Sequence, residues 1–322
     1  QTANSQGELL GEYRPTSQYA QGRNLGTWVA VSGAAASPNM GYHTSPAVAA
    51  LLTAYNLRLG RWCGNPQNDE VWDQGSPTFA SQPIFNELTG TANLRSRWIN
   101  LTDGGHFENL GVYELIRRRC RLIVVVDAGC DPDHEFFDLA NMIRKCWVDF
   151  GVNVRMPDMS NLRLDKEGLC KNHFVVGRIE YNTEKKYSTS EHNPTKRAKQ
   201  PTKSPKKNGV ILYVKSSLTG SEWPDIRQYA DSHPTFPHET TADQFFDEEQ
   251  FEAYRHLGFK MMRFLHNGIK DIVDPDKEKG IERTPISELV EKLFQYSLDQ
   301  EDAIRAARRS EEEDDGLGKK EA

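Results

Sequence analysis

Several features common in secreted and membrane proteins are missing from this sequence. The cysteines are odd in number and show no C-x-x-C spacing, which argues against a disulfide framework and favours a reducing compartment: they are Cys63, Cys120, Cys130, Cys146 and Cys170. No apolar run approaches the roughly 18 residues that a membrane-spanning helix needs. No signal-peptide pattern is present at the N-terminus. We therefore expect a cytoplasmic protein.

Basic residues are fewer than acidic ones, and the fraction of hydrophobic residues is lower than in a typical globular chain. The chain of 322 residues has 40 Lys and Arg against 46 Asp and Glu, a net charge of −6, which gives no reason to expect a nucleic-acid partner. Hydrophobic residues make up 37% of the chain, and the deficit is concentrated in residues 183–208 and 276–322. Residues 25–180 have the pattern of a folded core. Because the sequence starts at Gln1 without a Met, we expect that an N-terminal part is missing.

The apolar pattern predicts alternating strands and helices. Residues 122–126 are a continuous run of Leu, Ile and Val, which is typical of a parallel strand buried on both faces. A helix should follow, with Asp131 as its N-cap and Pro132 in its first turn. This alternation predicts an α/β fold with a mostly parallel sheet between helices. Strands are expected at 27–31, 98–101, 122–126, 152–155, 174–181 and 210–215, and further helices at 46–55, 108–119 and 242–266. The last two strands are expected to form a hairpin interrupted by an insertion.

Asp103 directly follows the predicted strand at 98–101 and precedes Gly104 and Gly105. Sites in open α/β sheets form at the carboxyl ends of the strands, where loops project side chains into a crevice. Paired glycines allow a turn with positive φ and a close approach of a ligand or another backbone segment. Asp-Gly-Gly is also ordinary turn chemistry, so the tripeptide alone does not decide between the two interpretations.

Two segments together have the pattern of a known family. Residues 101–111 read Leu-Thr-Asp-Gly-Gly-His-Phe-Glu-Asn-Leu-Gly, and a helical pattern and an apolar strand that ends at Asp127 follow them. Upstream, residues 30–38 read Ala-Val-Ser-Gly-Ala-Ala-Ala-Ser-Pro. In the same order, these segments resemble the Asp-Gly-Gly block and the preceding Ala-Ser-Ser-Ala-x-Pro stretch of the patatin-like and cytosolic phospholipase A families. The resemblance covers about residues 25–155.

The resemblance implies a three-layer patatin-like fold and a serine-type lipid acyl ester hydrolase with a Ser–Asp dyad. In such a dyad a serine attacks the ester carbonyl, an aspartate accepts the hydroxyl proton, and backbone N–H groups stabilise the oxyanion. Asp103 matches the catalytic aspartate, and Gly104 and Gly105 match the glycines that shape its turn. The implied substrate is a lipid or phospholipid, and no metal or organic cofactor is implied.

The nucleophile and the oxyanion loop of that family are not visible. The chain contains no Gly-x-Ser-x-Gly elbow and no Gly-Gly-Gly loop, and we expect both upstream of Gln1. Ser32 is the one alternative nucleophile in the chain, since it follows a predicted strand and precedes Gly33. However, Ala30 stands where the elbow needs glycine. A different class of function is a non-catalytic membrane-docking or interaction module derived from the same fold.

Charge and the resemblance together suggest three regions. Residues 1–24 should be a polar loop, residues 25–270 the C-terminal portion of a catalytic domain, and residues 271–322 a charged tail that is partly helical or disordered. Within the second region, residues 183–208 should form a mobile basic insertion.

A metal site is the less favoured reading of a group of potential ligands. Asp131 and Asp133 have a simpler explanation at a helix start, and Asp127 more simply accepts hydrogen bonds from nearby backbone. The spacing matches no His-Glu-x-x-His type pattern. The group comprises His106, Asp127, Asp131, Asp133 and His134.

Two basic segments are candidates for contact with an anionic membrane surface. The first ends a predicted helix, where favourable interaction with the helix dipole is the simpler explanation: Arg117, Arg118, Arg119 and Arg121. The insertion is the better candidate, because a flexible basic loop gains on the order of 1 kcal/mol per Lys or Arg near such a surface. The alternative is that this insertion is a solvated linker without a membrane contact. Phe245 and Phe246 are expected in the core.

Overall fold

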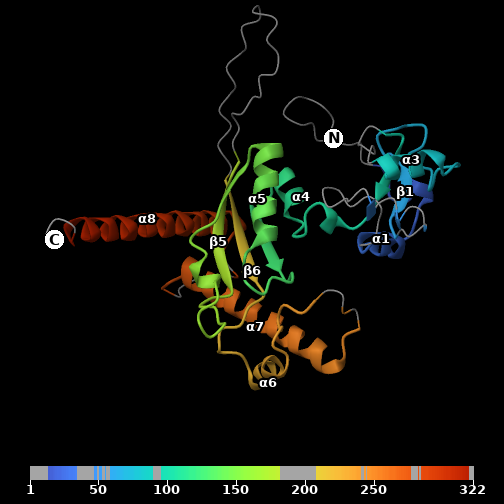
Figure 1. The fold of residues 1–322 in the computed structure, drawn as a ribbon. Helices are drawn as coiled ribbons and strands as arrows, with labels where there is room; N and C mark the ends of the chain where they lie inside the picture. The colour runs from blue at the N-terminus through green and yellow to red at the C-terminus, as the bar shows by residue number, and fades with distance from the viewer. Residues whose placement is uncertain are drawn as a thin grey trace, which may run out of the picture. The chain divides into compact units, whose positions relative to one another are not determined.

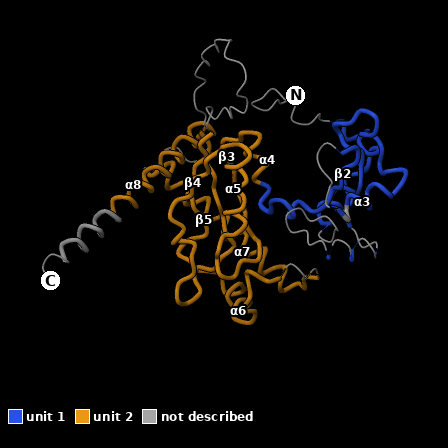
Figure 2. The backbone as a smooth tube through the Cα atoms, turned by 45° about the horizontal axis from the view of Figure 1, so that its top comes forward, with its two compact units in different colours: residues 1–111 blue, residues 112–322 orange. Residues whose placement is uncertain are grey.

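The computed structural model shows a mixed α/β protein made of two compact units, Gln1–Gly111 and Val112–Ala322 (Figures 1 and 2). The boundary lies inside the range 25–270, which was expected to form one portion of a domain. The insertion expected at 183–208 lies outside the described residues except for Asn208. The structure describes residues 14–34, 47–48, 51–52, 55, 59–89, 96–181, 208–240, 243, 245–276, 282 and 284–318.

The first unit is built around a two-stranded antiparallel sheet. Strands β1 (Arg61–Gly64) and β2 (Trp98–Leu101) pair with Cys63 opposite Ile99. A small buried cluster of Trp62, Val71 and Trp98 packs on this sheet. The elements of the unit with described bounds also include η1 (Tyr19–Gln21), α1 (Leu25–Ser32), α3 (Ser81–Thr89) and η3 (Gly104–His106).

The strand predicted at residues 27–31 is instead part of helix α1. Asn24 caps this helix, because its side-chain oxygen accepts a hydrogen bond of 2.9 Å from the N–H of Thr27. Such a cap stabilises a helix start by about 1 kcal/mol, which can outweigh the modest helix propensity of valine. The helix predicted at 46–55 is seen at residues 47–48 and 51–52. Most of its other positions lie outside the described residues.

The second unit contains a four-stranded mixed sheet with the order β3-β6-β5-β4. All four strands were predicted close to their observed positions, but only the β3–β6 pair is parallel. The expectation of a mostly parallel sheet is therefore wrong. The strands are β3 (Leu122–Asp127), β4 (Asn153–Arg155), β5 (Phe174–Glu180) and β6 (Gly209–Lys215).

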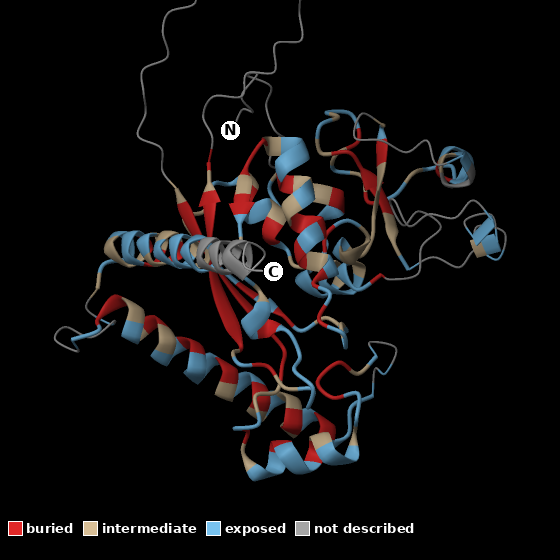
Figure 3. Ribbon diagram, turned by 60° about the vertical axis from the view of Figure 1, so that its left-hand side comes forward, coloured by how far each residue is buried: buried red, intermediate tan, exposed pale blue. Residues whose placement is uncertain are grey.

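Helices lie on both faces of this sheet (Figure 1). One face carries α4 (Val112–Arg117) and α5 (Phe137–Phe150). The other carries α6 (Pro224–Ser232), α7 (Glu248–Val273) and α8 (Ile286–Gly318), whose apolar side chains form the main core with alternate residues of β5 and β6. The strands β5 and β6 are almost entirely buried (Figure 3). Because Val290 and Leu293 are buried in this core, the first turns of α8 belong to the unit.

Strand β3 is less buried than its sequence predicts. Ile123 and Val125 are buried, but Val124 is 47% and Val126 59% exposed. β3 is an edge strand of the sheet, and the layer of α6, α7 and α8 covers β5 and β6 without reaching its outer residues. A continuous apolar run thus did not mean burial on both faces.

Two further local expectations differ from the structure. Helix α5 begins at Phe137 rather than at Asp131, because the residues after Asp131 form a turn in which Phe136 has a left-handed backbone (φ 58°). Phe245 and Phe246 are 93% and 47% exposed, so they are not core residues. Across the described residues, no helix combines the length and the apolar character needed to span a membrane.

Candidate functional site

Asp103 lies just beyond the end of β2 and caps the 3-10 helix η3. One carboxylate oxygen, Oδ1, accepts a hydrogen bond of 2.8 Å from the N–H of Gly105. The backbone N–H of Asp103 donates to the carbonyl of Ala34 at 3.4 Å. The side chain is half-buried, and within the described part of the chain Oδ2 has no hydrogen-bond partner. One oxygen of Asp103 is therefore held in place by its own turn.

Gly105 is favoured by close packing rather than by backbone handedness. A Cβ at this position would lie 2.9 Å from Oδ1 of Asn109 and 3.3 Å from Oδ1 of Asp103. A Cβ at Gly104 would meet nothing within 4 Å. Neither glycine has the positive φ that the sequence suggested, whereas Gly111, which ends the segment, does (φ 69°). Gly105 thus allows the carboxylate of Asp103 to fold over its own backbone.

The sheet around Asp103 is not the one expected. β2 pairs antiparallel with β1, so the rule that places sites at the carboxyl ends of parallel strands does not apply to Asp103. Local contacts hold the turn instead. Oγ1 of Thr102 lies 2.8 Å from Nδ1 of His106, and the carboxylate of the buried Glu108 accepts the N–H of Leu110 at 2.7 Å.

Ser32 does not lie on a nucleophile elbow. It is the last residue of helix α1, and its hydroxyl donates to the carbonyl of Val29 at 2.7 Å. An elbow serine sits on a sharp strand-to-helix turn that exposes its hydroxyl above the sheet. Ser32 and Asp103 are both in the first unit, and no hydrogen bond joins their side chains. The geometry therefore argues against Ser32 as the nucleophile.

The second unit contains a buried charge cluster at the carboxyl ends of its two parallel strands. Asp127 and Lys215 are the last residues of β3 and β6 and lie opposite each other in the register. The Nζ of Lys215, which is 1% exposed, lies 3.3 Å from Oδ1 of Asp127 and 3.3 Å from Oδ2 of Asp131. The hydroxyl of Tyr213 donates to Oδ2 of Asp127. The N–H of Gly129 donates to Oδ1 of Asp127 at 3.0 Å, so this carboxylate is fully engaged.

The cluster lines a polar cavity of about 210 Å³. Burial opposes ionisation of Asp131, but the N–H groups of Glu135 and Phe136 and the ammonium of Lys215 outweigh it and lower the pKa of this carboxyl. Burial, together with the charge of Asp127, raises the pKa of Tyr213. The acidic side chains that line the cavity are Asp127, Asp131, Asp133, Glu135 and Asp138.

His134 and His238 form a buried pair beside this cluster. Their Nε2 atoms are 3.0 Å apart, and Nδ1 of His134 lies 2.6 Å from the carbonyl of Leu162. If His134 donates from Nδ1, its Nε2 accepts the proton of His238 Nε2, and Nδ1 of His238 accepts the N–H of Asp131 at 3.3 Å. With both rings neutral, this assignment uses the contacts with Leu162 and Asp131, but Nδ1 of His238 cannot then donate to the carbonyl of Gly129, which lies 3.3 Å away. Burial above all, and then the nearby Lys215, lowers the pKa of His238 to about 4, and burial also lowers the pKa of His134.

We expect the free energy of unfolding to fall as the pH drops from about 6.5 to about 4. The unfolded chain binds a proton at His238 near its ordinary pKa of about 6.5, whereas the folded protein does not until about pH 4. Stability is thus complete above the unfolded pKa and is lost below it, by on the order of 2–3 kcal/mol for this residue. Urea unfolding at neutral pH and near pH 4.5 measures the loss.

His238→Gln should reduce this pH dependence, because the amide can still donate to His134 but does not titrate. The exposed His266 provides the matched control, and His266→Gln should leave the pH dependence unchanged. Equal loss of stability in the wild type and in His238→Gln would show that the pair does not control acid unfolding.

A serine, a histidine and a glutamate also meet in the second unit, but they do not form a catalytic triad. Nδ1 of His173 lies 3.0 Å from Oγ of Ser217, and Nε2 of His173 lies 3.9 Å from Glu222. Ser217 donates its proton to the carbonyl of Lys215 at 3.1 Å, so it can only accept from His173. It is also 1% exposed, which leaves no path for a substrate. In a catalytic triad the histidine accepts the proton of the serine, whereas here His173 donates a proton to the oxygen of Ser217.

The group considered as a metal site is divided between the two units. His106 lies in the first unit, and the other four residues lie in the second. His134 is engaged with Leu162 and His238, and Asp131 holds the turn before α5. Among the residues that the structure describes, no three His, Cys, Asp or Glu side chains are grouped so that they could hold a metal ion.

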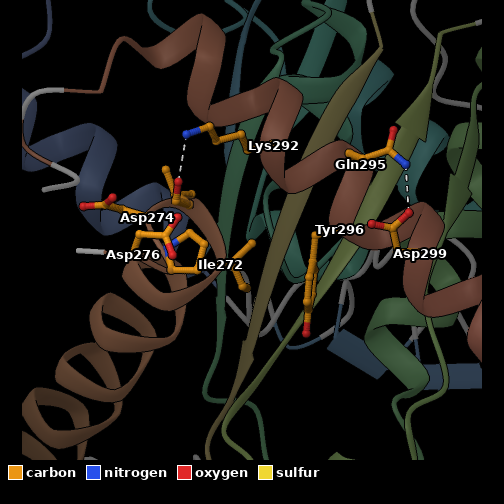
Figure 4. Close-up of a pocket in the computed structure, with 9 residues that line it drawn as sticks. Ile272, Asp274, Asp276, Lys292, Gln295, Tyr296 and Asp299 are labelled. Atoms are coloured by element: carbon orange, nitrogen blue, oxygen red, sulfur yellow. Dashed lines mark hydrogen bonds between the residues drawn. The ribbon is translucent and has the colours of Figure 1, made fainter. Parts of the chain in front are cut away.

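A hollow of about 490 Å³ lies between the C-terminal end of α7 and α8 (Figure 4). In Figure 4, Lys292 reaches the end of α7, where its Nζ donates to the carbonyl of Val273 at 2.8 Å. Gln295 donates to Asp299 at 2.8 Å, one turn further along α8. Lys292 thus caps the C-terminal end of α7. Lys292, Gln295 and Asp299 therefore have structural roles in helix capping and in contacts along α8.

Sequence reasoning proposed Asp103 as a site residue and did not single out Lys215, Tyr213 or His238. A lysine at the end of an apolar strand was the available signal for Lys215, since a lysine is rarely buried unless it is paired. No protein-family model matches the chain, and neither a curated protein nor a solved structure matches it. The resemblance to patatin-like phospholipases therefore stays a prediction.

Proposed function

We propose that this chain supplies the general-base aspartate of a serine-type lipid acyl ester hydrolase. The observation that carries the proposal is the geometry of Asp103, whose Oδ1 is held by Gly105 while Oδ2 has no partner in the described part of the chain. A carboxylate fixed in this way can accept a proton without first breaking a hydrogen bond. The patatin-like sequence pattern around Asp103 supplies the reaction class.

In the proposed reaction, Oδ2 of Asp103 accepts the proton of a serine hydroxyl as the serine oxygen attacks the ester carbonyl. The tetrahedral intermediate expels the alcohol, which takes the proton from Asp103, and leaves an acyl-serine. Water then attacks the acyl group, its proton passes to Asp103 and on to the serine, and the fatty acid leaves. The chain contains no Gly-x-Ser-x-Gly, so we propose that the serine belongs to sequence outside residues 1–322.

Labelling with a fluorophosphonate tests the source of the nucleophile. We expect residues 1–322 alone to form no covalent adduct, because Ser32 lies on a helix and donates its proton to Val29. A longer protein that includes the elbow serine should react. Intact-mass spectrometry after labelling measures both.

Two results would contradict this assignment in different ways. An adduct on the peptide that contains Ser32, lost in Ser32→Ala, would place the nucleophile within this chain. Absence of any adduct and of ester hydrolysis in the longer protein would favour the alternative, a non-catalytic module that docks on membranes. The exposed apolar and basic face of α7 gives that alternative a physical basis.

A further inference from the structure

Helix α7, which is partly exposed to solvent, contains a long stretch with several basic residues and no acidic ones. Residues 253–270 include no Asp or Glu, but four Lys or Arg and two His, in a chain whose net charge is −6. The acids of the helix lie outside this stretch, at Glu248, Glu249, Glu252 and Asp271. Three of these side chains are paired with acids, Arg255 with Glu252, His256 with Asp225 and Lys260 with Glu222. Among the described residues, Arg263 and Lys270 are the cations of this stretch without an acidic partner.

One side of α7 is committed to the core. Ala253, Leu257, Met261, Leu265 and Ile269 are buried at helical spacing and pack in the main cluster with the sheet and α8. Figure 3 shows buried residues alternating with exposed ones along this helix. The opposite side lies outside this cluster, although the ring of Phe259 there lies 6.1 Å from that of Trp223.

That opposite side combines exposed apolar side chains with cations. Phe259 is 54% and Met262 43% exposed. The guanidinium of Arg263 lies 5.9 Å from the centre of the Phe259 ring, so cation and aromatic ring are neighbours. We call this side the α7 stripe. Its residues follow the spacing of one helix face: Arg255, Phe259, Met262, Arg263, His266 and Lys270.

The surface of the stripe is hollowed between its turns. Phe259, Met262, Arg263, His266 and Asn267 line a hollow of about 400 Å³. Its lining is mainly apolar, with the charged groups at its margin. Such a surface offers contact to hydrocarbon and charge to an anion at the same time.

We propose that the α7 stripe docks on an anionic lipid surface. A helix whose exposed face carries aromatic residues, Met and Arg or Lys buries the apolar groups at the headgroup boundary while its cations meet the lipid phosphates and carboxylates. A second copy of this chain fits less well, because a two-fold contact through the stripe would place its cations opposite the same cations. The membrane supplies apolar contact for the exposed parts of Phe259 and Met262 and anionic groups for Arg263 and Lys270.

Vesicle sedimentation with the full chain tests the proposal. The probes are vesicles of phosphatidylcholine alone and of equal parts phosphatidylcholine and phosphatidylserine. Arg263→Gln with Lys270→Gln should weaken binding to the mixed vesicles about 30-fold, which corresponds to about 1 kcal/mol for each cation. These residues are chosen because Arg255 already forms a salt bridge of 2.7 Å with Glu252. Added salt should weaken binding of the wild type.

A second variant tests the apolar part of the stripe. Phe259→Gln with Met262→Gln should weaken binding to the mixed vesicles about 10-fold or more, because less apolar area enters the headgroup boundary. Both side chains lie outside the core cluster, so the melting temperature should change little. The matched control is Arg97→Gln with Arg305→Gln, which removes the same charge from side chains that are 51% and 61% exposed elsewhere. It should bind as the wild type does.

Three other results of the vesicle experiment would overturn docking through the α7 stripe. Unchanged binding in both stripe variants, with loss on deletion of residues 184–207, would assign membrane contact to the basic insertion and overturn the proposal. No vesicle binding by the wild type, or equal loss in the control variant, would also overturn it. Sedimentation needs no turnover, so failure of the hydrolase proposal would leave the docking result intact, and the reverse also holds.

Discussion

Asp103→Asn should remove most of the ester hydrolysis of a protein that contains this chain together with its nucleophilic serine. The asparagine keeps a side-chain oxygen that can accept the N–H of Gly105, now bonded to Oδ1 of Asp103 at 2.8 Å, so the turn should persist. It cannot accept the serine proton. General-base assistance contributes about 10²–10⁴-fold, and we expect a loss of kcat/KM in that range. Initial rates with a nitrophenyl ester and a melting curve measure activity and fold together.

The exposed Asp73 of the same unit is the control for this change. Asp73→Asn alters charge equally and should leave the rate within about two-fold, as surface substitutions usually have small effects. If Asp103→Asn keeps activity within a few-fold of the wild type at an unchanged melting temperature, Asp103 is not the base. A loss of activity that accompanies a loss of fold would instead assign Asp103 to turn formation, and the hydrolase proposal would lose its main support.

Lys215→Met should destabilise the second unit by about 3–5 kcal/mol. Methionine has a similar length but no charge, so Asp127 and Asp131 would lose the cation that lies 3.3 Å from each of them. Removing one partner of a buried ion pair leaves the other as an uncompensated charge, which is the costly case. For a unit of this size the melting temperature should fall by about 10 °C or more. Urea unfolding and a thermal melt measure the change.

A double variant separates loss of charge pairing from loss of packing. Asp127→Asn retains one oxygen, which can still accept the N–H of Gly129, while its amide N–H can donate to the hydroxyl of Tyr213. In Lys215→Met with Asp127→Asn, the uncompensated charge is removed as well, so a substantial part of the stability should return. Lys166→Met, at an exposed position, should change stability by no more than about 0.5 kcal/mol. A double variant less stable than Lys215→Met would contradict the electrostatic explanation.

Local sequence patterns determined much of the second unit. The apolar runs at β3, β5 and β6 predicted strands within one or two residues of their observed ends, since a continuous branched run flanked by turns favours a strand. The same patterns failed at residues 27–31. There a side-chain cap by Asn24 favours a helix, and an apolar run of five residues does not distinguish the two structures.

Strand direction could be read from the sequence only in part, and burial could not. The hairpin expected of residues 174–181 and 210–215 is confirmed, since β5 and β6 are antiparallel neighbours, but the parallel pairing of β3 beside β6 was not predicted. Val124 and Val126 have the same residue types as buried strand positions but lie exposed at a sheet edge. Pairing and edge position depend on which elements pack together, and residue type alone does not encode them.

The sequence by itself determined the turn at Asp103, because that turn depends on residues close together in the chain: the carboxylate accepts the N–H of Gly105, two residues on. The tertiary structure alone brought Asp127, Lys215 and His238 together, over more than 100 residues of sequence. It also divided the helix α7 into a buried face and an exposed cationic one. The physical reason is that local hydrogen bonding and sterics act over a few residues, whereas charge pairing and burial depend on neighbours that only the folded chain supplies.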